Sequence, residues 1–282
     1  MKHDDTHNEL DFFKNLENDF EQSDAELWAK IEQKIESKPK KTKTVKLFWA
    51  KYAVAAMLLL VIGAGGFMKF YTTTITTNKA DFAAHTLPDG SVVELNAETT
   101  LSYQPYWWQF DRSLQLAGEA FFEVEKGEKF TVHSAEGKTQ VLGTSFNIFA
   151  RNKDYKVFCR TGKVKVSSTK TAFQTHITAG EMAVVDNANK TGEKEKMALN
   201  NFMWWKNDKF NFVNENLPNV FAEIARQFDV EIVLENEKIA DFEMTASFEK
   251  HKNVEETLAL VCENFELSFE KTKGNVYQVL KK

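Results

Sequence analysis

Few residues of this chain stand in an arrangement that could do chemistry, and the dipeptide Gly143-Thr144 in VLGTSF is the first of them. Its threonine hydroxyl could attack the carbonyl of the preceding glycine, because glycine tolerates the strained backbone that such an attack requires. The other interpretation is a glycine at the start of a strand, followed by a β-branched residue. The pair therefore indicates either a self-cleavage site or an ordinary strand.

The remaining titratable side chains form no catalytic set. The carboxylates of Asp89, Glu94 and Glu119 have no catalytic partner nearby in the sequence, so we expect them to be solvated. Six histidines are scattered without an HExxH spacing, which argues against the common metal sites. The sequence therefore predicts no enzyme active site beyond a single self-cleavage, no metal and no cofactor.

The cysteines and the paired tryptophans each allow two interpretations. Cys159 and Cys262 are too few for a disulfide scaffold or a cysteine-based zinc module. We expect two buried free thiols, although a bridge between them could form in an oxidising compartment. The pairs Trp107-Trp108 and Trp204-Trp205 indicate either a platform on which a glycan stacks or packing within a core or linker.

The composition is that of a folded chain. Its 282 residues are 43% hydrophobic and 27% charged, with 12 glycines and 4 prolines, which excludes a disordered or fibrous protein. The net charge of −5 gives no reason to expect a nucleic-acid partner.

A membrane-spanning segment is predicted from Tyr52 to Met68, with flanks that extend it over residues 47–71. The stretch YAVAAMLLLVIGAGGFM carries no charge. A bilayer core needs about 20 mostly apolar residues, and Lys51 and Lys69 at the two ends can reach the headgroups. A buried helix of a soluble protein and a signal peptide are the alternatives. The long apolar run argues against the first, and the acidic segment that precedes the run argues against the second.

The lysines set the expected orientation. Residues 38–51 carry six lysines and no acidic residue, whereas residues 69–80 carry two lysines. The positive-inside rule then places the N-terminal segment in the cytoplasm and the rest of the chain outside it. The lysine run could also bind nucleic acid or anionic lipid, but its position against the span favours the topological role.

Residues 1–46 contain two short amphipathic helical patterns. Apolar residues recur at helical spacing in both, namely Phe13, Leu16 and Phe20 in the first and Leu27, Trp28, Ile31 and Ile35 in the second. Ser23-x-x-Glu26 predicts the capping box of the second helix. Helices this short are marginal in water, so we expect them to bind a partner protein through these apolar faces. A helix lying on the lipid surface is the alternative, which the acidic residues before Lys38 oppose.

The chain after the span is predicted to form two domains. Residues 84–187 show short alternating strands separated by turn signals such as Pro88-Asp89-Gly90, which is typical of an all-β domain. Residues 188–208 are expected to be a linker. In residues 209–282, helices are predicted to start after Asn216 and Asn253, with strands on either side. This order predicts a small α+β domain that duplicates a βαβ unit.

Five ordered segments give the chain its resemblance to a known family. LPDGSVVELNAETTLSY (87–103), LAGEAFFEVEKGE (116–128), FTVHS (130–134), VLGTSFNIFA (141–150) and GKVKV (162–166) resemble the periplasmic domain of FecR-type anti-sigma factors. The tail from Trp204 onward is similar to the small domain that follows it in Bacteroidetes members, which looks like the STN fold of secretins and TonB-dependent receptors. The resemblance covers about residues 84–282. In the cytoplasmic part only ELWAKIEQKIE (26–36) is similar.

The resemblance implies a single-pass protein of the inner membrane, with a cytoplasmic N-terminus and a periplasmic C-terminus. Its N-terminal helices would bind an extracytoplasmic-function sigma factor, and its periplasmic domains would receive a signal from the signalling domain of a TonB-dependent outer-membrane receptor. Envelope proteases would then release the sigma factor, and some family members are cut at the matching Gly-Thr bond. The alternative function is an inner-membrane-anchored module that binds a glycan or another periplasmic ligand without regulating a sigma factor.

Overall fold

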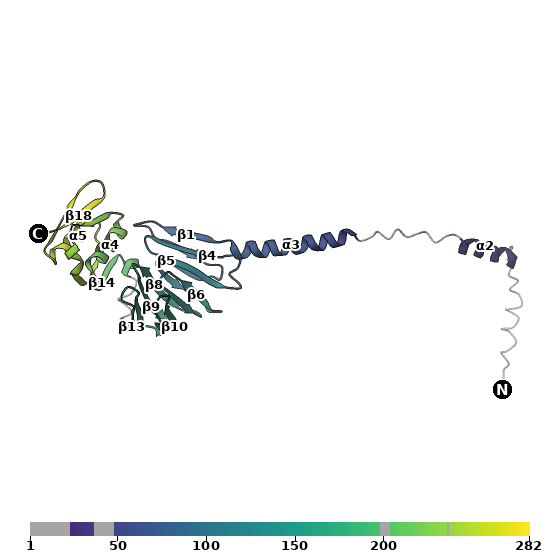
Figure 1. Cartoon of the computed structure of the whole chain (residues 1–282), viewed down its shortest axis with the longest axis horizontal. Helices are drawn as coiled ribbons and strands as arrows, with labels where there is room; N and C mark the ends of the chain where they lie inside the picture. Colours follow the sequence, from purple (N-terminus) through teal and green to yellow (C-terminus); the bar gives the residue numbers. More distant parts are fainter. Residues whose placement is uncertain (1–22, 37–47, 198–203, 236) are drawn as a thin grey trace, which may run out of the picture. The chain divides into compact units, whose positions relative to one another are not determined.

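The structure, a computed structural model, describes residues 23–36, 48–197, 204–235 and 237–282 (Figure 1). The chain divides into two units, one up to Leu59 and one from Leu60 to Lys282. Three of the predicted sigma-factor-binding residues, Phe13, Leu16 and Phe20, lie outside the described residues.

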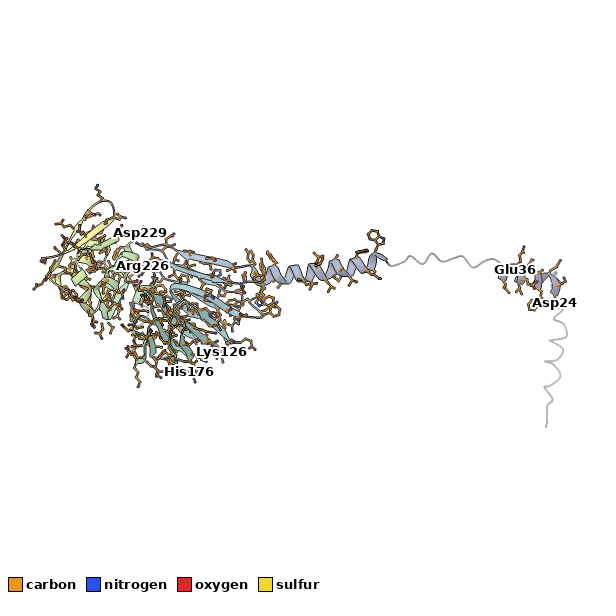
Figure 2. All side chains as sticks on the ribbon, in the orientation of Figure 1. Asp24, Glu36, Lys126, His176, Arg226 and Asp229 are labelled. Atoms are coloured by element: carbon orange, nitrogen blue, oxygen red, sulfur yellow. The ribbon has the colours of Figure 1, made fainter. Side chains whose placement is uncertain are left out.

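Helix α2 (Asp24–Glu36) is the predicted second cytoplasmic helix. It begins directly after Ser23, whose carbonyl accepts hydrogen bonds from the backbone N–H groups of Glu26 at 2.8 Å and Leu27 at 3.1 Å. No residue of α2 is buried, and its side chains point outward all around it (Figure 2). The helix therefore exposes its apolar stripe along with its charged positions.

Helix α3 (Phe48–Phe70) contains the predicted span Tyr52 to Met68. Its segment Trp49–Phe70 has 22 residues and is long and apolar enough to cross a membrane, and none of its most apolar stretch is buried in the structure. At 1.5 Å per residue this segment is about 33 Å long, close to the thickness of a bilayer core. A single-pass anchor is therefore compatible with α3.

Thirteen strands after α3 form two sheets that share one long strand. The first sheet has the order β1-β4-β5-β6-β7-β10-β11 and the second has the order β2-β3-β5-β8-β9-β12-β13. All pairs are antiparallel except β5 with β6. The strands are β1 (Thr73–Thr77), β2 (Ala83–Thr86), β3 (Val92–Leu95), β4 (Thr99–Tyr103), β5 (Arg112–Glu123), β6 (Phe130–His133), β7 (Gly137–Val141), β8 (Ser145–Arg151), β9 (Asp154–Thr161), β10 (Lys163–Ser168), β11 (Gln174–Thr178), β12 (Glu181–Asp186) and β13 (Thr191–Lys196).

Strand β5 passes from the first sheet to the second at Gly118. The residues before Gly118 pair with β4 and β6, whereas Gly118 and the residues after it pair with β8 and, further along, β3. The φ angle of Gly118 is +121°, and a Cβ atom there would lie 2.8 Å from the Cα of Thr99. Only glycine fits this crossing, because any side chain would meet both a disfavoured backbone angle and a neighbouring strand.

The two sheets enclose one apolar core. Side chains from both sheets alternate inward and form a single buried cluster that includes Phe122, Phe146 and Val166. Strand β1 precedes and β13 follows the predicted range 84–187, so this domain is longer at both ends. The segment TGEKEK of β13 is fully exposed and lies within the range 188–208 that the sequence predicts to be a linker, so this part of the prediction is wrong. It is a strand because its backbone pairs with β12 along its whole length, which the polar composition could not indicate.

The C-terminal residues form a separate small domain with the predicted order of elements. They are β14 (Lys209–Asn216), α4 (Leu217–Phe228), β15 (Glu231–Leu234), the 3-10 helix η3 (Glu237–Asp241), β16 (Glu243–Glu249), α5 (Val254–Glu263), β17 (Leu267–Lys271) and β18 (Val276–Lys281). The side chain of Asn216 caps α4 and that of Asn253 caps α5, as predicted. Another 3-10 helix, η2 (Trp204–Asn207), precedes β14.

The strands of this domain pair differently from the predicted duplicated βαβ unit. Strand β14 pairs with β16 in one antiparallel sheet, while β15, β18 and β17 form another. The two strands that flank α4 therefore belong to different sheets. The physical reason is that α4 packs on strands of both sheets, and one apolar core that includes Phe212 and Val279 joins the helices to them.

Candidate functional site

Four of the predicted sigma-factor-binding residues lie together on α2. Leu27, Trp28, Ile31 and Ile35 follow helical spacing and form one stripe. All four are exposed, Trp28 to 67% and Ile35 to 74%. An exposed apolar stripe on a helix whose other positions are mostly charged is a surface suited to binding in a groove of a partner.

Gly143 and Thr144 connect β7 to β8 at a place where the backbone requires glycine. The φ angle of Gly143 is +149°, and a Cβ atom there would lie 2.8 Å from the Cα of Lys126. The next residue, Thr144, is only 5% exposed, and its Oγ1 has no hydrogen-bond partner among the described residues. The backbone carbonyl of Thr144 accepts a hydrogen bond from the N–H of Val124 at 3.0 Å. A constrained glycine carbonyl therefore lies next to a buried, unpaired hydroxyl.

A basic groove lies beside this pair. Its volume is about 360 Å³, and Lys129, Lys163, Lys165 and His176 contribute to its walls (His176 is labelled in Figure 2). None of its described lining residues is a carboxylate. The lysines make the potential around the groove positive, which favours negative charge that develops on a nearby oxygen.

The carboxylate of Asp89 is held in an ion pair, contrary to the expectation that it is solvated. Arg112 donates from Nε to Asp89 Oδ2 at 2.8 Å and from a second guanidinium nitrogen to the same oxygen. Burial raises the pKa of Asp89, but hydrogen bonds from Arg112 and Ser91 outweigh it and hold the pKa below its ordinary value. This carboxylate fixes the Pro88-Asp89-Gly90 turn, which lies between β2 and β3 as predicted. Glu94 forms an ion pair with Lys206.

Glu119 is buried, so the prediction that it is solvated is wrong. It accepts hydrogen bonds from the side-chain amides of Asn96 at 2.7 Å and Asn147 at 2.8 Å. Burial raises the pKa of Glu119, and the nearby carboxylate of Glu223 raises it further. Glu119 follows Gly118 in β5 on the outer face of the second sheet, where the C-terminal domain covers it.

A polar network joins the two domains at this face. Arg226 of α4 donates to Glu98 at 2.9 Å and also binds Glu223. Gln227 donates from Nε2 to Asn96 Oδ1 at 2.9 Å. Sequence reasoning missed these residues because 128 to 131 positions separate the partners, and no local pattern marks such a contact.

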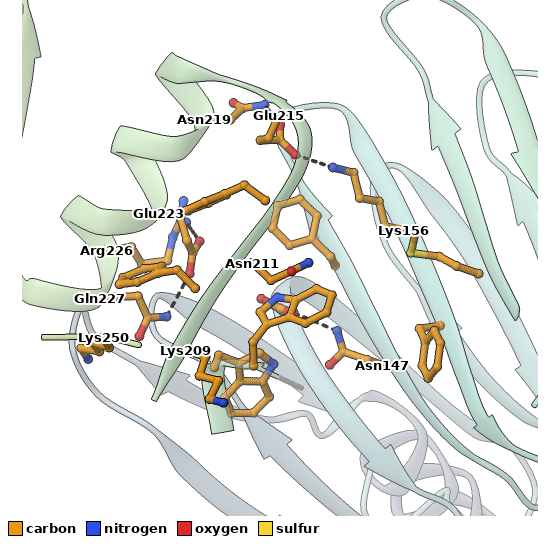
Figure 3. Close-up of a pocket in the computed structure, with 18 of the residues that line it drawn as sticks. Asn147, Lys156, Lys209, Asn211, Glu215, Asn219, Glu223, Arg226, Gln227 and Lys250 are labelled. Atoms are coloured by element: carbon orange, nitrogen blue, oxygen red, sulfur yellow. Dashed lines mark hydrogen bonds and ion pairs between the residues drawn. The ribbon is translucent and has the colours of Figure 1, made fainter. Parts of the chain in front are cut away.

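A second group of contacts extends the junction along the sheet. Lys156 of β9 binds Glu215 at 2.7 Å, as Figure 3 shows, and Asn152 donates to Asn219 at 3.0 Å. The ring of Trp205 stacks on Phe82 with 5.9 Å between centroids. A cavity of about 130 Å³ lies within this junction. The two domains are thus held together by ion pairs, hydrogen bonds and aromatic packing.

Strand β1 connects the end of α3 to this junction. Tyr71, just after α3, packs on Tyr106 with 5.2 Å between centroids. At the other end of β1, the N–H of Ala80 donates to the carbonyl of Arg226 at 2.8 Å, and Lys79 donates to the carbonyl of Val230 at 3.3 Å. A short strand therefore links the helix that could span a membrane to helix α4 of the C-terminal domain.

Both cysteines are buried free thiols, and Trp108 and Trp205 pack in apolar clusters. Cys159 and Cys262 are both free and buried, and burial raises the pKa of each thiol to about 11, which keeps it protonated. Trp108 lies in the core of the sandwich. Trp205 packs with Phe121 and Phe158 in a small cluster on the outer face of the second sheet.

Two family models match the chain in order. The model described as FecR protein matches residues 73–165, and the model described as FecR, C-terminal, matches residues 209–279. Together they account for more than half of the chain. Among curated proteins none matches.

Solved structures of similar fold carry a related description. Two crystal structures of a candidate anti-sigma factor from Parabacteroides distasonis ATCC 8503, at 2.50 and 1.65 Å resolution, are each 27% identical to this chain. The TM-scores are 0.70 and 0.69. The matches cover 75% and 74% of this chain and 100% and 99% of those chains. With both of its domains matched in sequence and in fold, the chain belongs to the FecR family.

Proposed function

We propose that this protein is a single-pass membrane anti-sigma factor whose N-terminal segment binds an extracytoplasmic-function sigma factor. The FecR and FecR C-terminal domains support this role, as does the fold shared with the Parabacteroides protein. The observation that carries the proposal is the uncovered apolar stripe of α2, which precedes in sequence a helix long enough to cross a membrane. An anchored chain with such a stripe can hold a soluble partner at the membrane.

The anchor would lie in the inner membrane with the N-terminus in the cytoplasm. Six lysines before the span and two after it support this orientation under the positive-inside rule. The sandwich and the C-terminal domain would then lie in the periplasm, where the sigma factor is out of reach. Any signal they receive must cross the bilayer through α3.

The signal would come from the signalling domain of a TonB-dependent outer-membrane receptor and reach the C-terminal domain first. Helix α4 supports this route, because the backbone carbonyl of its Arg226 accepts a hydrogen bond from the N–H of Ala80. Ala80 follows β1 in the chain, and β1 follows α3. Movement of α4 would therefore act on the segment next to the membrane. Envelope proteases that cut this segment or the span would then free the sigma factor.

The rival function is a membrane-anchored glycan-binding module with no sigma-factor partner, which the tryptophan-lined junction cavity favours. A pull-down separates the two functions. The full-length chain, tagged at its C-terminus and extracted from its own cells in detergent, should retain a sigma factor identified by mass spectrometry. The control is the same chain without residues 1–46, which should retain none. Equal retention by both forms, or none by either, contradicts the anti-sigma role.

We also propose that the Gly143-Thr144 bond undergoes one self-cleavage. Thr144 Oγ1 attacks the Gly143 carbonyl carbon, the amide bond breaks, and an ester with a free Thr144 amine results. Water then hydrolyses the ester to the Gly143 carboxylate and restores the threonine hydroxyl. The φ of +149° at Gly143 and the unpaired hydroxyl support the first step, and the lysines of the basic groove would stabilise the oxyanion.

Substitution of Thr144 tests this step. Thr144→Ala removes the nucleophile and should leave only the full-length chain, whereas Thr144→Ser keeps a hydroxyl and should still give two fragments. Immunoblotting of membranes with tags at both termini measures the products. Thr191→Ala is the matched control, since Thr191 lies on β13 and is exposed, and it should be cut like the unaltered chain. Cleavage of Thr144→Ala at the same bond, or an uncut natural chain, would exclude the mechanism.

A further inference from the structure

The loop between β4 and β5 (residues 104–110, the aromatic loop) exposes large aromatic side chains. Its sequence, QPYWWQF, contains four aromatic residues and no charged one. Tyr106 is 50% exposed and Phe110 is 65% exposed, whereas Trp108 is buried. Apolar side chains that lie so close together on the surface of a folded domain indicate a contact with another molecule or with lipid.

The aromatic loop is held in one conformation by the core of the sandwich. The ring of Trp108 makes edge contacts with those of Tyr103 and Phe130, at centroid distances of 5.5 and 5.7 Å. The N–H of Phe110 donates to the carbonyl of Trp107 at 2.9 Å and closes a backbone turn. The exposed rings are therefore positioned before they meet a partner, which lowers the entropy lost on contact.

The aromatic loop packs beside the last turn of α3 (Figure 1). The ring of Tyr106 lies 6.0 Å from that of Phe67 and 5.2 Å from that of Tyr71, measured between centroids. Phe67 belongs to the segment Trp49–Phe70 that is apolar enough to cross a membrane. It precedes the end of this segment by three residues, which is about 4.5 Å along the helix. A side chain that packs on Phe67 therefore lies at the depth where the apolar bilayer core meets the headgroups.

Lys69 places Trp107 at the same depth. The Nζ atom of Lys69 lies 5.8 Å from the centroid of the Trp107 ring, within the range of a cation–π contact. A lysine at the end of a span directs its ammonium group toward the headgroups. Tryptophan is enriched in this same layer of membrane proteins. The ring of Phe110 packs on that of Trp107 with 4.8 Å between centroids, so it lies next to this layer as well.

The charges that follow the aromatic loop limit how deep it can enter lipid. Asp111 is exposed, and its carboxylate accepts a hydrogen bond from the Ser113 hydroxyl at 2.9 Å. Moving this carboxylate into hydrocarbon would be costly, so it stays in water. Arg112 is already paired with Asp89. The aromatic side chains, rather than these charges, are thus the groups suited to contact lipid.

We infer that the aromatic loop lies in the headgroup layer of the bilayer that α3 crosses. The inference rests on the proposed membrane anchor. Tyr106, Trp107 and Phe110 bury apolar surface among the upper acyl groups, while the phenol and indole polar groups bond to water and headgroups. The sandwich then contacts the membrane at two places, α3 and the aromatic loop, and this restricts how it can turn on the membrane surface.

The depth of the aromatic loop can be measured by electron paramagnetic resonance on the full-length chain in phosphatidylcholine nanodiscs. A nitroxide is attached at Gln109→Cys, an exposed position of the loop. Oxygen concentrates in lipid and a nickel chelate stays in water, so the ratio of their collision rates with the label reports depth. The references are Leu60→Cys in α3 and Lys273→Cys in the exposed β17–β18 turn. The oxygen-to-nickel ratio at 109 should lie between those at 60 and 273. Because Cys159 and Cys262 are buried, the chain without an added cysteine should give only background.

Loss of an aromatic side chain should move the label toward water. Phe110→Ser should lower the oxygen-to-nickel ratio at 109 at least about threefold, because burying an exposed phenylalanine shifts an equilibrium about tenfold or more. Trp107→Ser should act in the same direction. Val213→Ser is the matched control, since Val213 is an exposed apolar residue of β14, and it should leave the ratio unchanged. Thermal unfolding shows whether each variant keeps its fold. If Trp107→Ser is destabilised, Phe110→Ser alone decides, because Phe110 is largely exposed.

Three results would overturn the inference. The first is a ratio at 109 equal to that at 273, which would place the loop in water. The second is a ratio at 109 that neither serine variant lowers. The third is a label at 109 shielded from both oxygen and nickel, which would mean that protein, such as a second copy of this chain, covers the loop. A low ratio at 60 would contradict the anchor as well, whereas a high ratio at 60 with a low one at 109 refutes the loop contact alone.

Discussion

Replacement of Trp28 by aspartate in the full-length chain should raise the transcripts that the sigma factor controls by at least about tenfold. Trp28 is the largest side chain of the α2 stripe and is 67% exposed, so it can enter a pocket of a partner. Burying an aspartate in such a pocket costs several kcal/mol, and a loss of even about 3 kcal/mol weakens binding more than a hundredfold. The free sigma factor would then compete for RNA polymerase.

The measurement compares transcripts in three strains: the unaltered strain, one that carries Trp28→Asp and one that lacks the whole gene. The Trp28→Asp profile should match that of the deletion. Gln33→Asp is the matched control, since Gln33 lies on the opposite face of α2 and should leave transcripts unchanged. An immunoblot must show equal amounts of each protein in the membrane. Unchanged transcripts at equal amounts would mean that α2 does not hold the sigma factor.

Replacement of Arg226 by alanine should loosen the junction between the two outer domains. Arg226 is 8% exposed and forms ion pairs with Glu98 and Glu223. Its removal leaves Glu223 without this cation and close to the buried carboxylate of Glu119, which raises the electrostatic cost of the folded state. Because Glu98 is half exposed, we expect the free energy of unfolding to fall by about 2 kcal/mol rather than the larger cost of a fully buried pair.

Denaturant unfolding of the full-length chain in nanodiscs measures this change, and hydrogen exchange locates it. Amide hydrogen exchange should increase first in α4 and in residues 78–82, because the N–H of Ala80 donates a hydrogen bond to the carbonyl of Arg226. The matched control is Arg160→Ala. Its ion pair with Glu123 is about half exposed at 3.6 Å, and its loss should cost less than about 0.5 kcal/mol. Equal effects of the two substitutions would show that the junction network does not hold the domains together.

Much of the local structure could be predicted because local rules decide it. The asparagine caps of α4 and α5 lie where the sequence places them, since a side-chain oxygen at that position satisfies a free backbone N–H. Period-two alternation located strands such as β8 and β9, because one face of each is buried. The uncharged run from Tyr52 to Met68 lies within one continuous helix, and this too is predicted by the local composition of the sequence.

The rest depends on contacts between distant residues. Strand β13 has no apolar residue, and only its pairing with β12 makes it a strand. The burial of Glu119 follows from the C-terminal domain covering the sheet, which a pattern of neighbours along the chain cannot show. Pairs such as Arg226 with Glu98 join two domains across 128 positions, and each partner alone resembles an ordinary surface charge. The junction and its cavity could therefore be found only in the folded chain.

The interleaving of strands has a consequence for a chain cut after residue 143. Strand β5 pairs with β8, and β7 pairs with β10, so ladders of hydrogen bonds cross the position of the break. Both halves also contribute to one apolar core. A nicked molecule would therefore remain a single body at equilibrium. The two fragments would separate only under force or on unfolding. The cut would therefore make their separation easier but would not by itself release anything.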